Sequence, residues 1–397
     1  MRNNPVYVSS ADWVATMVNS RFFSSFNETH KRTVFVDAAS WEYVGRDFNS
    51  CDGEISGKTI TSRRDRSGPS RLNQRSSIFK RLILSMSLSG IEIADEDSSV
   101  PVRLAYCLNR LAGHHPDRSV ELSKRIFDKT KVGDTDEKPR GTCLRTFVGL
   151  HVWRDHGAAK QAVYDLLKDV QAHTRELQVV LSILREPLTH GVAGGSTTED
   201  SAVRSRSVEL FHAVTVAACD AFTTLLARSQ TQEWSESDAE VLREVARLVD
   251  GSGTDLYFAS GVFTGGQNGE KRITFEQQER FYREISPTIN RLSTIGLASV
   301  VPRLVEMLEI FVPFDPRKVF LQVSALVESS RRDNYQYESM AIDHIVRIVA
   351  RYLAEYRSLL QEDAECRTAL RKTLDVFVSA GWPAAQQLSY RLDEIFR

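Results

Sequence analysis

Residues 337–360 read YESMAIDHIVRIVARYLAEYRSLL, and this stretch decides the fold class. Its apolar residues recur every three or four positions, at Ala341, Ile345, Ile348, Tyr352, Tyr356 and Leu359. This spacing places them along one side of an α-helix, because a helix turns once every 3.6 residues. The same period continues through residues 275–397 with no strand pattern. We therefore expect an all-α fold.

The composition is that of a folded, nearly neutral protein. Of its 397 residues, 42% are hydrophobic and 26% are charged, which is enough apolar material for a core. Lys and Arg number 51 against 52 Asp and Glu, so the formal net charge is -1. This balance argues against a protein that coats nucleic acid, because long-range attraction to a polyanion requires surplus positive charge.

The cysteines and the apolar runs bear on the cellular compartment. The five cysteines are scattered and form no C-x-x-C pair, unlike those of a disulfide-rich secreted scaffold. Residues 1–13 lack the apolar run of a secretory signal, and no uninterrupted apolar run reaches the ~18 residues of a membrane span. We therefore expect a cytoplasmic protein with reduced thiols and no membrane partner.

Breaks in the helical pattern divide the chain into four segments. Residues 1–76 are irregular and end in a basic, flexible linker, and residues 77–249 are helical. Residues 250–274 are rich in glycine and predict a loop or hairpin insertion, after which residues 275–397 form a repeat-like helical region. Helices of about 15 to 20 residues joined by short breaks favour an irregular αα-hairpin or HEAT-like repeat array, with a compact bundle as the alternative.

Four capping patterns predict where individual helices begin. In a capping box, a Ser or Thr side chain and a Glu or Gln three residues later satisfy free amides of the first turn. A capping residue followed by proline has the same meaning, because the first helical position needs no N–H donor. These patterns occur at Ser237/Glu240, Thr274/Gln277, Ser286/Pro287 and Asp315/Pro316.

No pattern of residues predicts a catalytic, cofactor or metal site. The tripeptide at 57–59 is Gly-Lys-Thr, but Asp52 stands where a phosphate-binding loop has its first glycine. His151 and His156 are five positions apart, whereas two zinc ligands on one helix face are four apart. We interpret both as surface or partly buried histidines beside Trp153. The sequence therefore predicts no enzyme activity and no cofactor.

Two segments are candidate interaction surfaces. The first is a basic cluster, for which a solvated linker is the preferred interpretation and contact with phosphates or an acidic partner is the alternative. It comprises Arg63, Arg64, Arg66, Arg71 and Arg75. The second lies in RRDNYQYE, between two predicted helices, where Tyr and Arg are residue types favoured at protein interfaces. It comprises Arg331, Arg332, Tyr335 and Gln336, and the alternative is that Tyr337 packs inward at the helix start.

The last third of the chain also resembles a known group of proteins. Between residues 255 and 397, the segments LYFASGVF, FVPFDPRKVFL, YQYESMAIDHIVRIVARYLAEYR and DVFVSAGWPAAQQLSYRLDEIFR are similar to the C-terminal helical region of large bacterial multidomain ATP-binding proteins of the sensor-NTPase type. The resemblance implies a distal recognition or scaffold segment, in a group linked to defence against phage. The ATPase module of that group has no visible counterpart in this sequence.

These observations predict a non-enzymatic helical-repeat protein that binds another protein, for example an ATPase encoded nearby. One alternative is a nucleic-acid-associated sensor that uses the basic cluster, and another is a fragment of a multidomain ATPase. A third is an enzyme with dispersed residues around Asp37, Glu42 and Asp47. The sequence leaves the oligomeric state and the identity of the partner open.

Overall fold

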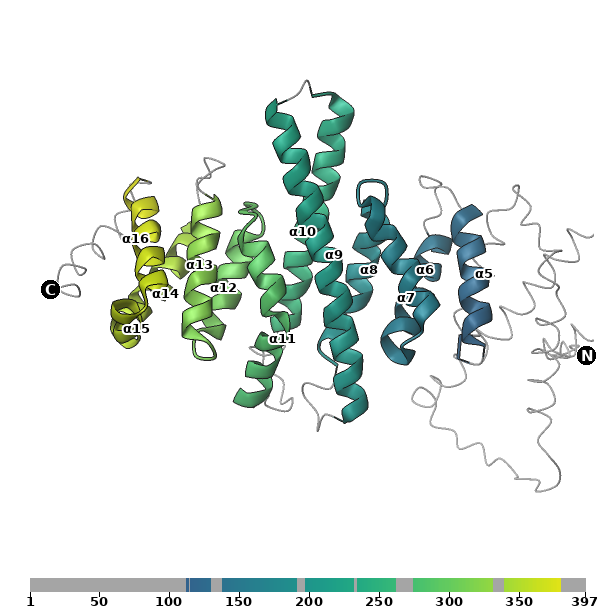
Figure 1. The fold of residues 1–397 in the computed structure, drawn as a ribbon, viewed down its shortest axis with the longest axis horizontal. Helices are drawn as coiled ribbons and strands as arrows, with labels where there is room; N and C mark the ends of the chain where they lie inside the picture. Colours follow the sequence, from purple (N-terminus) through teal and green to yellow (C-terminus); the bar gives the residue numbers. More distant parts are fainter. Residues whose placement is uncertain are drawn as a thin grey trace, which may run out of the picture. The chain divides into compact units, whose positions relative to one another are not determined.

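The computed structural model describes residues 112–113, 115–129, 138–190, 197–231, 234–261, 274–330 and 339–379. Within these ranges the chain forms twelve α-helices and one short 3-10 helix, and no strand (Figure 1). The predicted all-α fold is therefore confirmed. The chain divides into two compact units, Met1–Thr146 and Phe147–Arg397. The predicted irregular segment 1–76 lies outside the described residues.

The described part of the first unit contains helix α5 (Pro116–Lys129) and the first part of α6 (Lys138–Arg154). Arg140 joins the two helices. Its Nη1 donates a hydrogen bond of 2.9 Å to the backbone oxygen of Phe127, and its guanidinium lies 3.9 Å from the centroid of the Phe127 ring. A cation over an aromatic face stabilises such a contact electrostatically.

The second unit begins inside α6 and contains the remaining helices. They are α7 (Gly157–Leu166), η3 (Leu167–Asp169), α8 (Thr174–Leu188), α9 (Thr198–Thr231), α10 (Glu236–Gly261), α11 (Phe275–Ser293), α12 (Val301–Phe311), α13 (Pro316–Ser330), α14 (Ser339–Glu355), α15 (Arg357–Glu362) and α16 (Ala364–Ser379). Most helices pack on the next helix or the next but one, whereas α16 packs mainly on α13. Thus α8 contacts α9 and α10, α9 contacts α11, α10 contacts α12, and α12 contacts α14. This is a helical array in which layers follow the chain order.

Helices α9 and α10 are the longest, with 34 and 26 residues. They lie side by side, and their joined ends reach past the neighbouring helices of the second unit (Figure 1). Within the described residues, α9 is long and apolar enough by length and composition to cross a membrane. This is weak support for a membrane span, because α9 packs against α8, α10 and α11 as a core helix does.

The expected loop or hairpin over residues 250–274 is wrong for residues 250–261, where α10 continues to Gly261. Leu248, Leu256 and Ala259 are buried and carry the apolar stripe of α10 through the glycines. A Cβ on Gly253 would lie 2.8 Å from Cγ1 of Val300, so this glycine lets the two chain segments approach closely. Residues 262–273 lie outside the described residues.

The four predicted helix starts have mixed outcomes. The capping box of Thr274 and Gln277 is confirmed, and Asp315 caps α13 by accepting a 3.0 Å hydrogen bond from the amide of Lys318. The box predicted at Ser237/Glu240 is wrong by two residues, because Ser235 and Asp238 exchange the capping hydrogen bonds. The start predicted at Ser286/Pro287 is also wrong, since both residues lie inside α11.

Tertiary packing explains why α11 continues through Pro287. Ser286 does not cap a helix; instead its hydroxyl accepts a 3.1 Å hydrogen bond from Nε2 of the buried Gln322 in α13. The Tyr282 hydroxyl donates to the other end of the same amide, at 3.1 Å. Satisfied polar networks of this kind fix the register of two helices, because an unpaired buried amide is costly.

Candidate functional site

The predicted interaction residues are not placed by the structure. All nine lie outside the described residues, so both candidate surfaces remain predictions; they are Arg63, Arg64, Arg66, Arg71, Arg75, Arg331, Arg332, Tyr335 and Gln336. The described residues contain no group of three or more His, Cys, Asp or Glu side chains that could hold a metal ion. The remaining candidates are the other charged and aromatic side chains of the second unit.

Three cysteines can be assessed as nucleophiles. Cys143, Cys219 and Cys366 are buried and free. Burial raises the pKa of the first two thiols to about 12 and that of Cys366 to about 11. A reactive cysteine requires a lowered pKa, because the thiolate is the nucleophile. These three thiols are therefore core side chains.

A group of titratable side chains lies where α6, α7 and α9 meet. We call it the His151 cluster; its members are His151, Lys160, Tyr164, Arg206 and Glu209. Helix α6 ends at Arg154 and α7 begins at Gly157, so only two residues connect them. Asp155 takes a positive φ of 55°, a strained conformation for a residue with a Cβ. His156 then caps α7, its Nδ1 accepting a 3.3 Å hydrogen bond from the amide of Ala159.

Glu209 of α9 is the centre of this cluster. Its Oε1 lies 2.8 Å from Nζ of Lys160 and 3.3 Å from the hydroxyl of Tyr164, both on α7. The hydrogen bond from Lys160 lowers the pKa of Glu209, and the same bond raises the pKa of Lys160. Burial is the main cause of the raised pKa of Tyr164. Arg206 donates from Nε to the backbone oxygen of Val152, at 2.8 Å, and so closes the end of α6.

His151 differs from the other members because it is fully buried. The expectation of a surface or partly buried histidine is therefore wrong for this residue, whereas Trp153 does lie close by on the same helix. Burial is the largest cause of its lowered pKa, so the imidazole is held neutral. A buried neutral ring lets the end of α6 pack closely against its neighbours.

The pKa shifts of Lys160 and Glu209 keep both groups charged and do not favour proton transfer. A general acid or base works best when its pKa lies near the working pH. Here the pKa of Lys160 is raised and that of Glu209 is lowered, so both groups stay charged through the neutral range. The cluster is suited to joining α7 to α9 by an ion pair.

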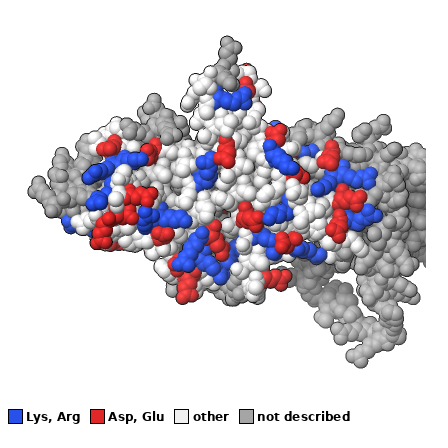
Figure 2. All heavy atoms as spheres, viewed as in Figure 1, with Lys and Arg blue, Asp and Glu red and all other residues white. Residues whose placement is uncertain are grey.

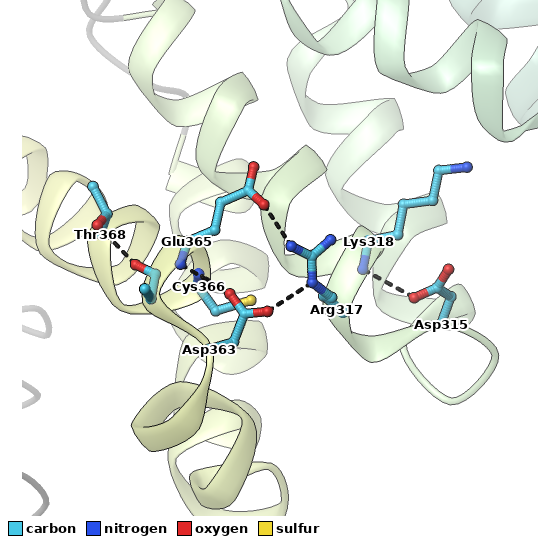
Figure 3. Close-up of polar contacts among 8 residues, drawn as sticks. Asp315, Arg317, Lys318, Asp363, Glu365, Cys366 and Thr368 are labelled. Atoms are coloured by element: carbon cyan, nitrogen blue, oxygen red, sulfur yellow. Dashed lines mark hydrogen bonds and ion pairs between the residues drawn. The ribbon is translucent and has the colours of Figure 1, made fainter.

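The C-terminal helices carry a second polar cluster, drawn in Figure 3, around Arg317 of α13. Its guanidinium binds Asp363 through Nε, at 2.7 Å, and Glu365 through Nη2, at 2.5 Å. Oδ1 of Asp363 accepts hydrogen bonds of 2.9 Å from the amides of Glu365 and Cys366, which caps α16. These bonds lower the pKa of Asp363 to about 2. All these groups are satisfied within the chain, so this cluster anchors α16 to α13.

Two large aromatic rings are exposed beside the C-terminal half of α8. Trp153 of α6 is 43% exposed, and its ring packs edge-on against His190, with 4.6 Å between centroids. Phe258 of α10 is 53% exposed, and the guanidinium carbon of Arg185 lies 5.2 Å from its ring centroid. We call these four residues the α8 aromatic surface. It draws on three helices, and α8 with the residues just after it supports both rings.

The polar side chains that hold these rings are themselves fixed. Arg185 donates from Nε to Oδ1 of the buried Asp255, at 2.8 Å. His190 lies 3.0 Å from Asp200, measured between Nε2 and Oδ1. Arg204, buried in α9, donates to the backbone oxygen of His190. Supports of this kind leave the rings little freedom to turn away from solvent.

Arg204 also ties this region to the next layer of the array. It makes two hydrogen bonds to Glu284 of α11, of 2.7 and 3.2 Å. Ion pairs between layers recur along the unit, and the face drawn in Figure 2 shows basic and acidic side chains in small mixed groups. This face carries no large patch of one sign, as the near-neutral composition predicts.

Neither the His151 cluster nor the α8 aromatic surface could have been identified from the sequence. The Lys160–Glu209 pair spans 49 positions and Arg185–Asp255 spans 70, so no local motif contains them. Comparison of the chain with protein families, curated proteins and solved structures finds no match. The geometry of the chain itself therefore carries the functional argument.

Proposed function

We propose that the chain is a non-enzymatic helical-array protein that binds another protein, as the recognition or scaffold part of a larger bacterial system. One observation carries the proposal. Trp153 of α6 and Phe258 of α10 are exposed, and each contacts a polar side chain on or just after α8 that is bonded into the fold. Large aromatic rings contribute strongly to the energetics of an interface when a partner covers them.

The residue types and their rigidity support a contact with a protein. Aromatic and arginine side chains dominate the binding energy of protein interfaces, because they bury a large area and also form hydrogen bonds. A ring that is already fixed loses little conformational entropy on binding. The α8 aromatic surface has both properties, with Arg185 beside Phe258 and His190 beside Trp153.

The proposal is tested by capturing partners with the tagged full-length chain, expressed at its native level in its own host. We expect one protein to be recovered in a fixed ratio. Trp153→Ala or Phe258→Ala should each weaken its binding about thirtyfold, since a hot-spot side chain contributes ~2 kcal/mol or more.

Phe275→Ala is the matched control, because this ring is 57% exposed but packs on Phe314, away from α8. Far-UV circular dichroism of each variant checks that the fold is kept. Equal binding by the Trp153, Phe258 and Phe275 variants would refute the assignment of the α8 aromatic surface. Recovery of no stoichiometric partner would count against the function itself.

The resemblance of residues 255–397 to the distal region of sensor-NTPase-type proteins accords with this role and names a class of partner. An ATP-binding protein encoded nearby would supply the module that the resemblance implies, and defence against phage would be the setting. The captured partner should then bind ATP. The basic cluster Arg63–Arg75 keeps the nucleic-acid sensor as the alternative, which predicts binding that falls steeply with salt.

A further inference from the structure

His151 is the least explained side chain of the second unit. It has no solvent exposure, and neither Nδ1 nor Nε2 has a hydrogen-bond partner among the described residues. Most buried polar groups in proteins are hydrogen-bonded, and each exception requires an explanation. A purely structural position would be filled at lower cost by leucine, which packs without unpaired polar atoms.

Charged groups on α7, on α9 and in the connector after α6 act electrostatically on this ring; they are Lys160, Arg206, Glu209 and Asp155. The hydroxyl of Tyr164 on α7 lies 3.3 Å from Oε1 of Glu209. The carboxylate of Glu209 already accepts hydrogen bonds from Lys160 and Tyr164 through Oε1. Neither ring nitrogen of His151 has an acceptor in this closed arrangement, so a proton taken up by the ring would be buried without a hydrogen bond.

We propose that His151 is an acid-sensitive switch that opens the corner between α6, α7 and α9. The neutral ring fits the closed corner. The imidazolium must instead reach water or Glu209, so proton uptake favours a state in which the end of α6 moves and the bonds of Glu209 to α7 loosen. The strained Asp155 lies in the two-residue connector that would take up this movement. Trp153 lies two residues from His151, so opening would also disturb the α8 aromatic surface.

The direction in which pH changes the stability of the closed state follows from proton binding. Burial, with a smaller contribution from Lys160, lowers the pKa of His151 in the closed state below its ordinary value of 6.5. The open state therefore binds more protons, and the closed state loses stability as the pH falls below about 6.5. The opening equilibrium constant should rise by up to about tenfold per pH unit, the limit for one proton.

Hydrogen exchange measured by mass spectrometry on the isolated full-length chain tests the switch without any partner. Exchange is compared at about pH 7.5 and pH 5.5 after correction for the intrinsic rate. Peptides from residues 147–166 should lose protection by up to about tenfold per pH unit below 6.5. Peptides from 364–379 serve as the internal reference, because they lie in a different layer. Failure of the proposed function would leave this result unchanged.

Two variants assign the effect to the right histidine. His151→Leu should abolish the loss of protection at residues 147–166, whereas His190→Gln should retain it, although His190 lies beside Trp153. If His151→Leu does not fold, His151→Gln replaces it, because the amide cannot take up a proton in this range. Unchanged protection of the parent chain between the two pH values would overturn the proposal. So would a pH response that survives in the folded His151 variant.

Discussion

Replacing Gly296 by alanine tests how closely the layers of the array pack. Gly296 lies in the turn between α11 and α12 with φ of 67°, a left-handed conformation that costs a residue with a Cβ about 1–2 kcal/mol. A Cβ would lie 2.5 Å from the carbonyl carbon of Ser329 and 2.8 Å from the amide nitrogen of Ser330. These are backbone atoms and cannot rotate away, so overpacking adds about 1–3 kcal/mol. We expect a loss of about 2–5 kcal/mol in the free energy of unfolding.

Urea unfolding followed by far-UV circular dichroism measures this loss in the full-length chain. Gly251→Ala is the control, because Gly251 lies inside α10 and a Cβ there would meet nothing within 4 Å. Alanine favours a helix by about 0.5–1 kcal/mol over glycine, so the control should be at least as stable as the parent. A Gly296→Ala variant within about 0.5 kcal/mol of the parent would refute the close packing of this turn on the end of α13.

Two further predictions concern the polar contacts between layers. Arg204→Met leaves the carboxylate of Glu284 without its partner and should lower the free energy of unfolding in urea by about 3 kcal/mol. Adding Glu284→Met should restore much of that loss, because no unpaired charge then remains. Equal stability of the single and double variants would contradict a buried ion pair. Asp363→Ala removes the cap of α16 and the partner of Arg317, so it should lower the melting temperature at neutral pH. The fold lowers the pKa of Asp363 from 3.8 to about 2. The difference in melting temperature between parent and variant should therefore persist above pH 3.8 and fade as the pH falls towards 2. A difference that is constant down to pH 2 would contradict the role of the Asp363 carboxylate.

Helical periodicity in the sequence predicted the fold because it records which side of each helix is buried. Ala341, Ile345, Ile348 and Tyr352 are all fully buried in α14, as their spacing requires. The same reasoning failed where packing between helices overrides local signals. The glycines of α10 predicted a break, but the helix continues through them and Gly253 permits close contact with Val300. Pro287 likewise lies inside a helix, which its neighbours hold together.

The candidate site was beyond prediction for a different reason. A charged residue exposed on one helix reads as solvated surface until the helix beside it is known. Lys160 and Glu209 come together only through the packing of α7 on α9, and Arg185 and Phe258 only through that of α8 on α10. The position of Trp153 near His151 was visible in the sequence, but the burial of His151 was not.

The order of contacts along the array determines how the chain would tolerate the gain or loss of helices. Ion pairs between layers join residues 38 to 80 positions apart, as at Glu309–Arg347 and Arg204–Glu284. Each layer therefore depends on its immediate neighbours and hardly on distant ones. A pair of helices gained or lost in the middle would need only two new junctions, so recombination could alter the reach of this scaffold while leaving the α8 aromatic surface intact.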